Sequence, residues 1–193
     1  MNVNVKRIDG VWKLGYSLDK HTTSSTPIGY NQYGHIQFDT VRSEAGEALF
    51  QLKYRSDFSQ VSVIAQQLNE SLGNFFSSCE LVIPMPASKQ RIRQPVTEIA
   101  RELAILMGIP CLEELLVKTN DTPAIKDAGA REYRVSTLMN VFTISDVLPS
   151  GLHDILIVDD LFDTGSSLEA ATNVLKGYSK IQDVYVATVT RKQ

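Results

Sequence analysis

Two adjacent carboxylates follow an apolar run in the segment ILIVDDLFDTGSSLEAA, which covers residues 155–171. Asp159 and Asp160 come directly after four residues suited to a buried strand. Paired carboxylates in that position accept hydrogen bonds from a vicinal diol, or face a Mg²⁺ ion that also holds phosphate oxygens. The alternative without chemistry is an acidic strand end followed by a capped helix.

The segment DTGSS that follows, residues 163–167, has the composition of a phosphate-binding turn. Gly165 allows the backbone to approach a ligand closely, and the helix expected after it begins with unpaired N–H groups. Thr164, Ser166 and Ser167 add hydroxyl donors, so the turn suits a phosphate monoester. A Walker-type P-loop is excluded because no lysine follows the glycine at the required position. A segment suited to bind a diol, a phosphate and magnesium indicates a ribose phosphate as the ligand.

Cations are concentrated in two further segments. LVIPMPASKQRIR, residues 81–93, is an apolar run followed by a turn that holds Ser88, Lys89, Arg91 and Arg93. Residues 119–134 are expected to form a long mobile loop, which follows Lys118 and contains Lys126, Arg131 and Arg134. For both segments the alternative is a solvated loop with scattered charge.

Apolar periodicity predicts the elements that position these groups. Apolar runs indicate strands at 80–86, 112–118, 155–160 and 183–191, and helical patterns cover 43–57, 58–73, 94–108 and 166–178. Because strands alternate with helices, we expect an α/β fold with a mostly parallel sheet flanked by helices on both faces. Ligands bind at the carboxyl ends of such strands, where each polar segment above falls.

The N-terminal region is expected to be organised differently from the rest. Asp9-Gly10 lies between two β-prone runs and predicts a hairpin with a type I′ turn. Residues 21–40 are rich in Gly, Asn, Ser and Thr and indicate loops and short strands. We therefore expect an N-terminal hairpin or hood region over residues 1–42 and an α/β core over 43–193, within a single compact domain.

The thirteen residues ILIVDDLFDTGSS resemble the phosphoribosyl pyrophosphate (PRPP) signature of type I phosphoribosyltransferases. The resemblance implies that fold, with a small N-terminal hood over the acceptor base. It implies that Asp159 and Asp160 bind the ribose hydroxyls and face Mg²⁺ indirectly, through the ribose or water. It places the 5-phosphate on residues 163–167. Asp163, where many members have threonine, is the pattern of enzymes for 6-oxopurines.

Other parts of the chain are similar to the ComF-like family of predicted amidophosphoribosyltransferases. The resemblance implies a pyrophosphate site at Ser88, Lys89, Arg91 and Arg93, although RIRQPV stands where those proteins usually have RGFNQ. It extends to a loop pattern at Lys118, Thr122, Arg134, Asn140 and Phe142. It implies catalytic roles for Asp163, Lys118 and Arg134, and the N-terminal zinc module of many ComF proteins is absent. Candidate acceptor contacts in the hood are Tyr16, His21, His35 and Arg42.

Net charge, cysteine content and hydropathy argue against several classes of protein. The formal net charge of −3 argues against a broad nucleic-acid-binding face. Cys79 and Cys111 form no metal-binding or disulfide pattern, and the chain has no apolar stretch suited to a signal peptide or a membrane span, so we expect a soluble, cytoplasmic protein. The leading hypothesis is a Mg²⁺-dependent phosphoribosyltransferase that joins PRPP to an unidentified nitrogen acceptor. Alternatives are a non-catalytic PRPP or nucleotide sensor and an accessory protein of nucleic-acid metabolism. A homodimer is compatible with the resemblance.

Overall fold

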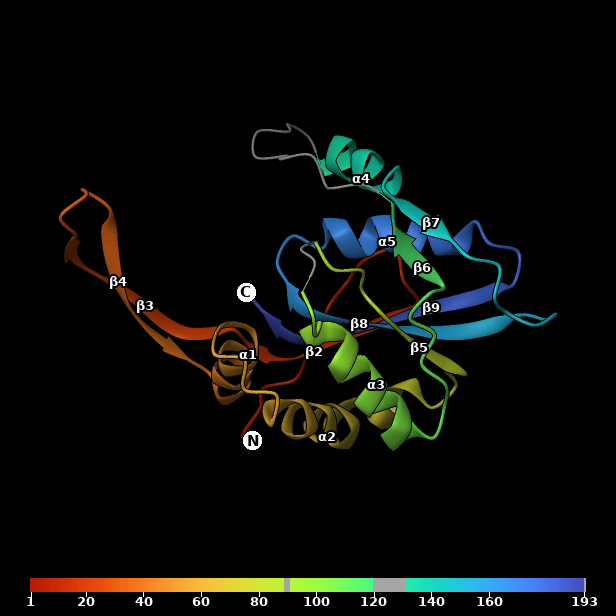
Figure 1. Ribbon diagram of the computed structural model, residues 1–193, viewed down its shortest axis with the longest axis horizontal. Helices are drawn as coiled ribbons and strands as arrows, with labels where there is room; N and C mark the ends of the chain where they lie inside the picture. The colour runs from red at the N-terminus through yellow and green to blue at the C-terminus, as the bar shows by residue number, and fades with distance from the viewer. Residues whose placement is uncertain (89–90, 120–130, 193) are drawn as a thin grey trace.

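A central, mostly parallel sheet organises the computed structural model, which describes residues 1–88, 91–119 and 131–192 (Figure 1). The strand order in this sheet is β1-β2-β9-β8-β5. β2, β9, β8 and β5 run parallel, and only β1 is antiparallel to its neighbour. The strands are β1 Lys6–Arg7, β2 Leu14–Lys20, β5 Leu81–Pro84, β8 His153–Phe162 and β9 Ile181–Arg191. The expected α/β class with a mostly parallel sheet is confirmed.

Helices cover both faces of this sheet, as expected. α1, α2 and α3 lie on one face, whereas α5 lies on the other with α4 packed outside it (Figure 1). The helices are α1 Glu44–Tyr54, α2 Gln60–Leu72, α3 Pro95–Met107, α4 Arg131–Met139 and α5 Ser166–Lys176, with a short 3₁₀ helix at Gly73–Phe76. In β8, Leu156 and Val158 join the core under α1–α3, while Ile155 and Ile157 join the core under α5. Strand side chains alternate between faces, so an uninterrupted apolar run is what a sheet covered on both sides requires.

Local signals fix several helix ends. The Ser43 hydroxyl accepts a hydrogen bond from the Gly46 N–H at 3.0 Å and so caps α1. α3 ends at Gly108, whose φ of 69° lies in the left-handed region that glycine tolerates. Both ends agree with the sequence patterns at 43–57 and 94–108.

A second, two-stranded sheet carries Lys118 toward the carboxyl edge of the first. It pairs β6, Leu116–Lys118, with β7, Phe142–Ile144, in antiparallel register. The strand expected over 112–118 is therefore shorter than predicted. The expected loop over 119–134 is wrong at its end, because residues 131–134 form the first turn of α4, and residues 120–130 lie outside the described part of the chain.

The N-terminal hairpin exists, but its expected type I′ turn is wrong. β1 and β2 are joined by residues 8–13, and Gly10 does not have positive φ. The buried Trp12 indole lies against Gly10 and donates to the Ile8 carbonyl at 3.0 Å, so a larger, ring-filled loop replaces the tight turn. β2 pairs in parallel with β9 inside the central sheet.

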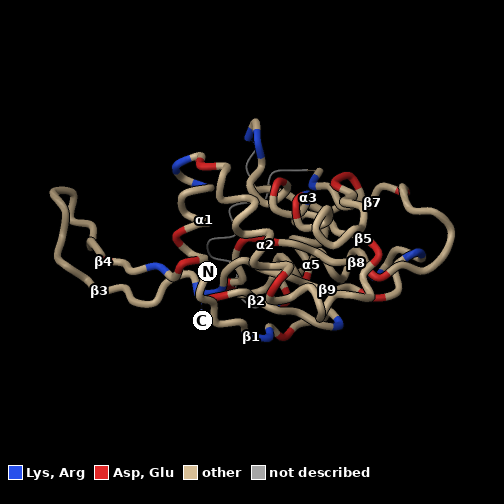
Figure 2. Tube along the Cα trace, turned by 90° about the horizontal axis from the view of Figure 1, so that it is seen from below, with Lys and Arg blue, Asp and Glu red and all other residues tan. Residues whose placement is uncertain are grey.

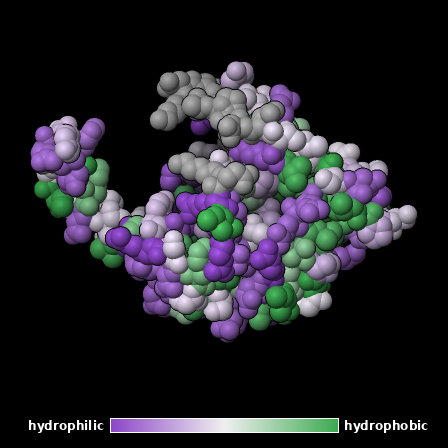
Figure 3. All heavy atoms as spheres, viewed as in Figure 1, coloured by the Kyte–Doolittle hydropathy of each residue, from purple (hydrophilic) through white to green (hydrophobic). Residues whose placement is uncertain are grey.

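A second hairpin projects from the body (Figure 1). It consists of β3, Thr22–Tyr30, and β4, Ile36–Arg42, and leads directly into α1. Its outer part is almost without charged residues (Figure 2), whereas apolar side chains gather on it (Figure 3) and include the exposed Ile28, Ile36 and Phe38. Within the described residues, no helix is long and apolar enough to cross a membrane.

Candidate functional site

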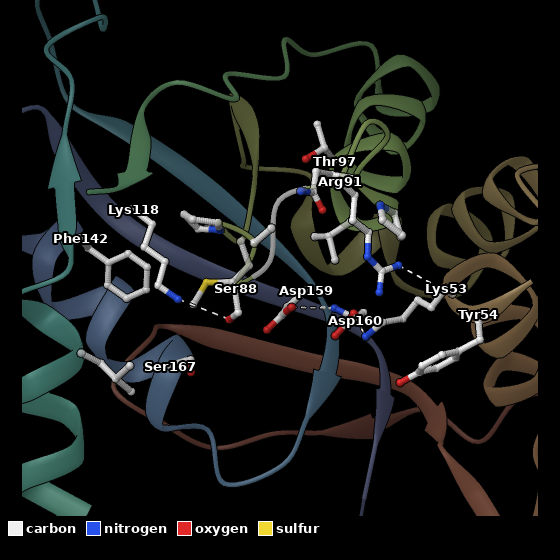
Figure 4. Close-up of a pocket in the computed structure, with 17 residues that line it drawn as sticks. Lys53, Tyr54, Ser88, Arg91, Thr97, Lys118, Phe142, Asp159, Asp160 and Ser167 are labelled. Atoms are coloured by element: carbon white, nitrogen blue, oxygen red, sulfur yellow. Dashed lines mark hydrogen bonds and ion pairs between the residues drawn. The ribbon is translucent and has the colours of Figure 1, made fainter. Parts of the chain in front are cut away.

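A cavity of about 440 Å³ opens at the carboxyl edge of the central sheet (Figure 4). The ends of β5 and β8, the C-terminal turn of α1, the start of α3 and the β6–β7 pair contribute its walls. Its polar and charged lining residues are Lys53, Tyr54, Ser88, Arg91, Gln94, Thr97, Lys118, Asp159, Asp160 and Ser167. Five segments that are apart in the sequence, within 53–54, 85–97, 118, 138–142 and 159–167, therefore meet in one cavity.

The acidic pair lies in this cavity and is internally connected. The Asp160 N–H donates to the Asp159 carboxylate at 2.8 Å, and the Asp160 carboxylate forms an ion pair with the Lys53 ammonium. Burial, and then the neighbouring Asp160 charge, raise the pKa of Asp159 to about 8. Asp159 therefore holds a proton at neutral pH, while Asp160 has the Lys53 cation beside it.

The phosphate-type turn has the local geometry that the sequence suggested. Gly165 has φ of 77°, and a Cβ there would lie 2.8 Å from the Phe162 ring, so both conformation and space favour glycine. The hydroxyls of Thr164 and Ser166 lie 3.1 Å apart, and α5 begins at Ser166. The N–H groups of the first turn of α5 and these hydroxyls are donors of the kind that anion sites use. Ser167 reaches the cavity lining.

Arg131 holds this turn from outside. Its guanidinium donates to the Thr164 carbonyl at 2.7 Å and pairs with Glu169 of α5 at 2.5 Å. The sequence indicated a cationic residue here but placed it on a loop. The structure instead puts Arg131 at the start of α4, where it joins α4 to the phosphate-type turn.

The candidate catalytic residues lie in three different settings. Lys118 lines the cavity and donates to the Ser88 hydroxyl at 3.3 Å. Asp163 is about half exposed, forms an ion pair with Lys192 and is not among the cavity-lining residues. Arg134 lies in α4, also outside the lining, and its buried Nε has no hydrogen-bond partner within the residues that the structure describes. Of these three residues, the structure places only Lys118 in the cavity wall.

The four candidate pyrophosphate residues also lie in different surroundings. Ser88 and Arg91 line the cavity, and Arg91 donates to the Lys53 carbonyl at 2.9 Å. Arg93 turns away, since its guanidinium pairs with Glu98 at 2.9 Å and lies 3.8 Å over the Phe58 ring. Lys89 lies outside the described residues.

The four candidate acceptor contacts are spread over the N-terminal strands. Tyr16 stacks on Phe75 with ring centroids 4.3 Å apart, and His35 lies near the tip of the projecting hairpin. Arg42 lies 3.7 Å over the Phe50 ring. His21 follows β2 at the carboxyl edge, and its Nδ1 lies 3.1 Å from the Thr190 hydroxyl. Burial, followed by the nearby Arg42 and Lys53 charges, lowers the pKa of His21. Of these four residues, His21 lies on the edge that carries the acidic pair.

Lys53 is the site residue that the sequence did not reveal. It lies near the end of α1 and belongs to none of the predicted site motifs, yet its ammonium reaches a carboxylate 107 positions away (Figure 4). Tyr54 and Thr97 also line the cavity from helices. A basic residue in the last turn of a helix is common and gives no information about what it faces.

The residues fit a divalent cation only when a ligand supplies most of its coordination. Among the described residues, no group of three or more His, Cys, Asp or Glu side chains is arranged around a common point. Asp159 and Asp160 provide carboxylate oxygens, which hard cations prefer, but one carboxylate already faces Lys53. Both cysteines are free thiols. The donor set therefore fits a metal ion carried by a phosphate ligand, with indirect help from the acidic pair.

This chain is similar in structure to several solved proteins, three of which are given below. A hypothetical protein from Neisseria gonorrhoeae with bound ppGpp aligns with TM-score 0.44 and 16% identity over 68% of this chain. The alignment covers 66% of the Neisseria protein, just under two thirds of that protein's length. Orotate phosphoribosyltransferase from Aeropyrum pernix aligns with TM-score 0.44 and 16% identity over 84% of each chain. Adenine phosphoribosyltransferase from Saccharomyces cerevisiae aligns with TM-score 0.49 and 16% identity over 87% of this chain and 83% of that one. No family model and no curated protein sequence matches.

Proposed function

We propose that this protein is a phosphoribosyltransferase that transfers the 5-phosphoribosyl group of PRPP to a nitrogen acceptor and releases pyrophosphate. The observation that carries the proposal is the meeting of three groups in one cavity. These are the acidic pair, Ser167 at the end of the phosphate-type turn, and a wall that holds Arg91 and Lys118. A ribose with a phosphate at one end and a pyrophosphate at the other needs those three kinds of contact.

Each end of PRPP has a matching set of residues. The 5-phosphate would bind at residues 163–167, where the N-terminus of α5 provides N–H donors. The 2′- and 3′-hydroxyls would donate to Asp159 and Asp160 at the end of β8. The pyrophosphate would lie against Ser88, Arg91 and Lys118 on the opposite wall. Lys89 and Arg93 complete the predicted pyrophosphate set, and Arg93 would have to leave Glu98 to join it.

The proposed reaction exchanges one bond at C1 of the ribose for another. The lone pair of the acceptor nitrogen forms the new C–N bond as the C–O bond to pyrophosphate breaks, and the bonding electrons leave with the pyrophosphate. The acceptor proton passes through water to Asp163, the first residue of the phosphate-type turn, whose carboxylate pairs with Lys192. The role of Mg²⁺, when it is bound with PRPP, is to neutralise charge on the leaving group. Arg91 and Lys118 stabilise the same charge from the protein side.

We also propose the finer assignments, which come from the resemblances and from composition and charge. They are a ComF-like phosphoribosyltransferase in the cytoplasm with Mg²⁺ as cofactor and no direct nucleic-acid partner. The interspersed charges of both signs agree with the last point (Figure 2). Within the N-terminal region, the hood would be the projecting hairpin, residues 22–42, because β1 and β2 belong to the central sheet.

Calorimetry with PRPP and Mg²⁺ tests the binding half of the proposal. Binding should be lost in the Asp159→Asn/Asp160→Asn double variant and kept in Asp183→Asn, which changes a carboxylate near the amino end of β9. Unchanged PRPP affinity in the double variant would contradict the assignment.

Turnover tests the catalytic half. Release of pyrophosphate should appear with at least one member of a panel of bases and amines. Tight PRPP binding with silence across the whole panel would favour a sensor instead of an enzyme.

A further inference from the structure

Lys53 lies in the last turn of α1, and its side chain lines the cavity. Its ammonium forms an ion pair with Asp160 inside the cavity, and only 24% of its side chain is exposed. The partner side chain is 17% exposed. Figure 4 shows the two side chains directed toward one another from α1 and β8. The helix thus delivers a positive charge to the carboxylate that the proposed function assigns to the ribose.

The backbone of Lys53 is tied to the opposite wall. Arg91 donates to the Lys53 carbonyl at 2.9 Å, and both side chains line the cavity. This bond joins the last turn of α1 to the turn after β5, where the pyrophosphate would bind. Lys53 therefore lies between the ribose carboxylates and the pyrophosphate wall.

The Lys53 ammonium has more N–H donors than its bond to Asp160 uses. A lysine ammonium carries three N–H groups. Asp160 accepts one of them, and the structure gives no further acceptor for the others among the residues it describes. An anion that enters the cavity near Asp160 would meet these donors with the lysine already held in place.

We propose that Lys53 is a pyrophosphate-binding residue whose fixed positive charge does part of the work of Mg²⁺ beside the acidic pair, so that the site retains affinity for PRPP and pyrophosphate without the metal. This inference rests on the proposed function and adds a residue to it. Two cations that face the same anion partly substitute for each other, so loss of Lys53 should matter most when Mg²⁺ is absent.

Isothermal titration calorimetry with PRPP and with inorganic pyrophosphate, each in excess Mg²⁺ and in EDTA, tests the idea. In EDTA, Lys53→Met should weaken both ligands on the order of tenfold to a hundredfold, the range for a lost charge-assisted hydrogen bond. In Mg²⁺ the loss should be several-fold smaller. Lys53→Arg should retain most of the metal-free affinity, which separates loss of charge from loss of fold. Lys13→Met, which removes an ion pair with Asp183 at the surface, is the matched control and should bind like the wild type.

The possible results distinguish failure of this inference from failure of the proposed function. If wild-type protein binds PRPP and Lys53→Met binds equally well in EDTA, or more tightly, Lys53 is a competitor for Asp160 or a bystander, and the inference is overturned while the proposed function stands. An equal loss with and without Mg²⁺ also overturns it, because the substitution would then be independent of the metal. Wild-type protein that binds neither ligand in Mg²⁺ overturns the proposed function and this inference with it.

Discussion

Asp159→Asn should stabilise the ligand-free protein at alkaline pH. The folded protein raises the pKa of this carboxyl from 3.8 to about 8, first because it is buried and then because Asp160 lies beside it. Asparagine keeps the shape and the oxygen that accepts the Asp160 N–H at 2.8 Å, but never has to ionise. The substitution therefore removes a cost of folding and retains the local hydrogen bond.

The direction in which stability changes with pH follows from the number of protons that the folded and the unfolded protein bind. Between about pH 4 and pH 8 the folded protein keeps a proton on Asp159 that the unfolded chain has released. Wild-type stability therefore falls as pH rises through this window and levels off above it. The full displacement sets a ceiling of about 6 kcal/mol. Since the carboxyl faces an open cavity that water can enter, we expect Asp159→Asn to gain about 2–3 kcal/mol at pH 8.5 and under about 1 kcal/mol at pH 5.

Urea unfolding at pH 5 and pH 8.5, without ligand or metal, measures both values. The exposed Asp39→Asn on the projecting hairpin serves as the control and should give the same small difference at both pH values. An Asp159→Asn protein that is no more stable than wild type at pH 8.5 would refute the reasoning. So would a gain of equal size at the two pH values.

Three further substitutions test the backbone that positions the site. Gly165→Ala should cost about 1–3 kcal/mol in urea unfolding, because φ is 77° and the new Cβ would meet the Phe162 ring; a neutral result would mean that the turn relaxes freely. Gly46→Ala should cost more than about 2 kcal/mol, since the Cβ would lie 2.1 Å from the His21 carbonyl oxygen, and thermal unfolding near the wild-type midpoint would disprove this contact. Ser43→Ala should cost about 1 kcal/mol because it removes the hydroxyl that caps α1 and donates to the Lys20 carbonyl, whereas Ser43→Thr, which keeps a hydroxyl, should cost less; equal losses would show that these hydrogen bonds are not the cause.

Local sequence determined much of the fold. The apolar run at 155–158 specified a strand that is buried on both faces, and Leu156 and Ile157 indeed pack into different cores. Ser43 and Gly108 marked helix ends because caps are made by residues within a few positions of each other. The phosphate-type turn at 163–167 was predictable for the same reason, since its glycine conformation and the start of α5 depend on adjacent residues.

Tertiary structure decided which charges face the cavity. The sequence grouped Arg91 with Arg93, but Arg93 turns to Glu98 and Phe58 while Arg91 reaches the cavity. It grouped Asp163 with the phosphate-type turn, whereas the folded chain pairs Asp163 with Lys192. It gave no sign of Lys53, whose partner Asp160 is 107 positions away. The partners of long, flexible side chains depend on the sheet order β2-β9-β8-β5 and on the packing of α1, because these set which charged groups lie within reach of one another. The sequence by itself therefore determined the strand, the turn and the helix that frame the acidic pair, while only the tertiary structure decided the cation that balances it.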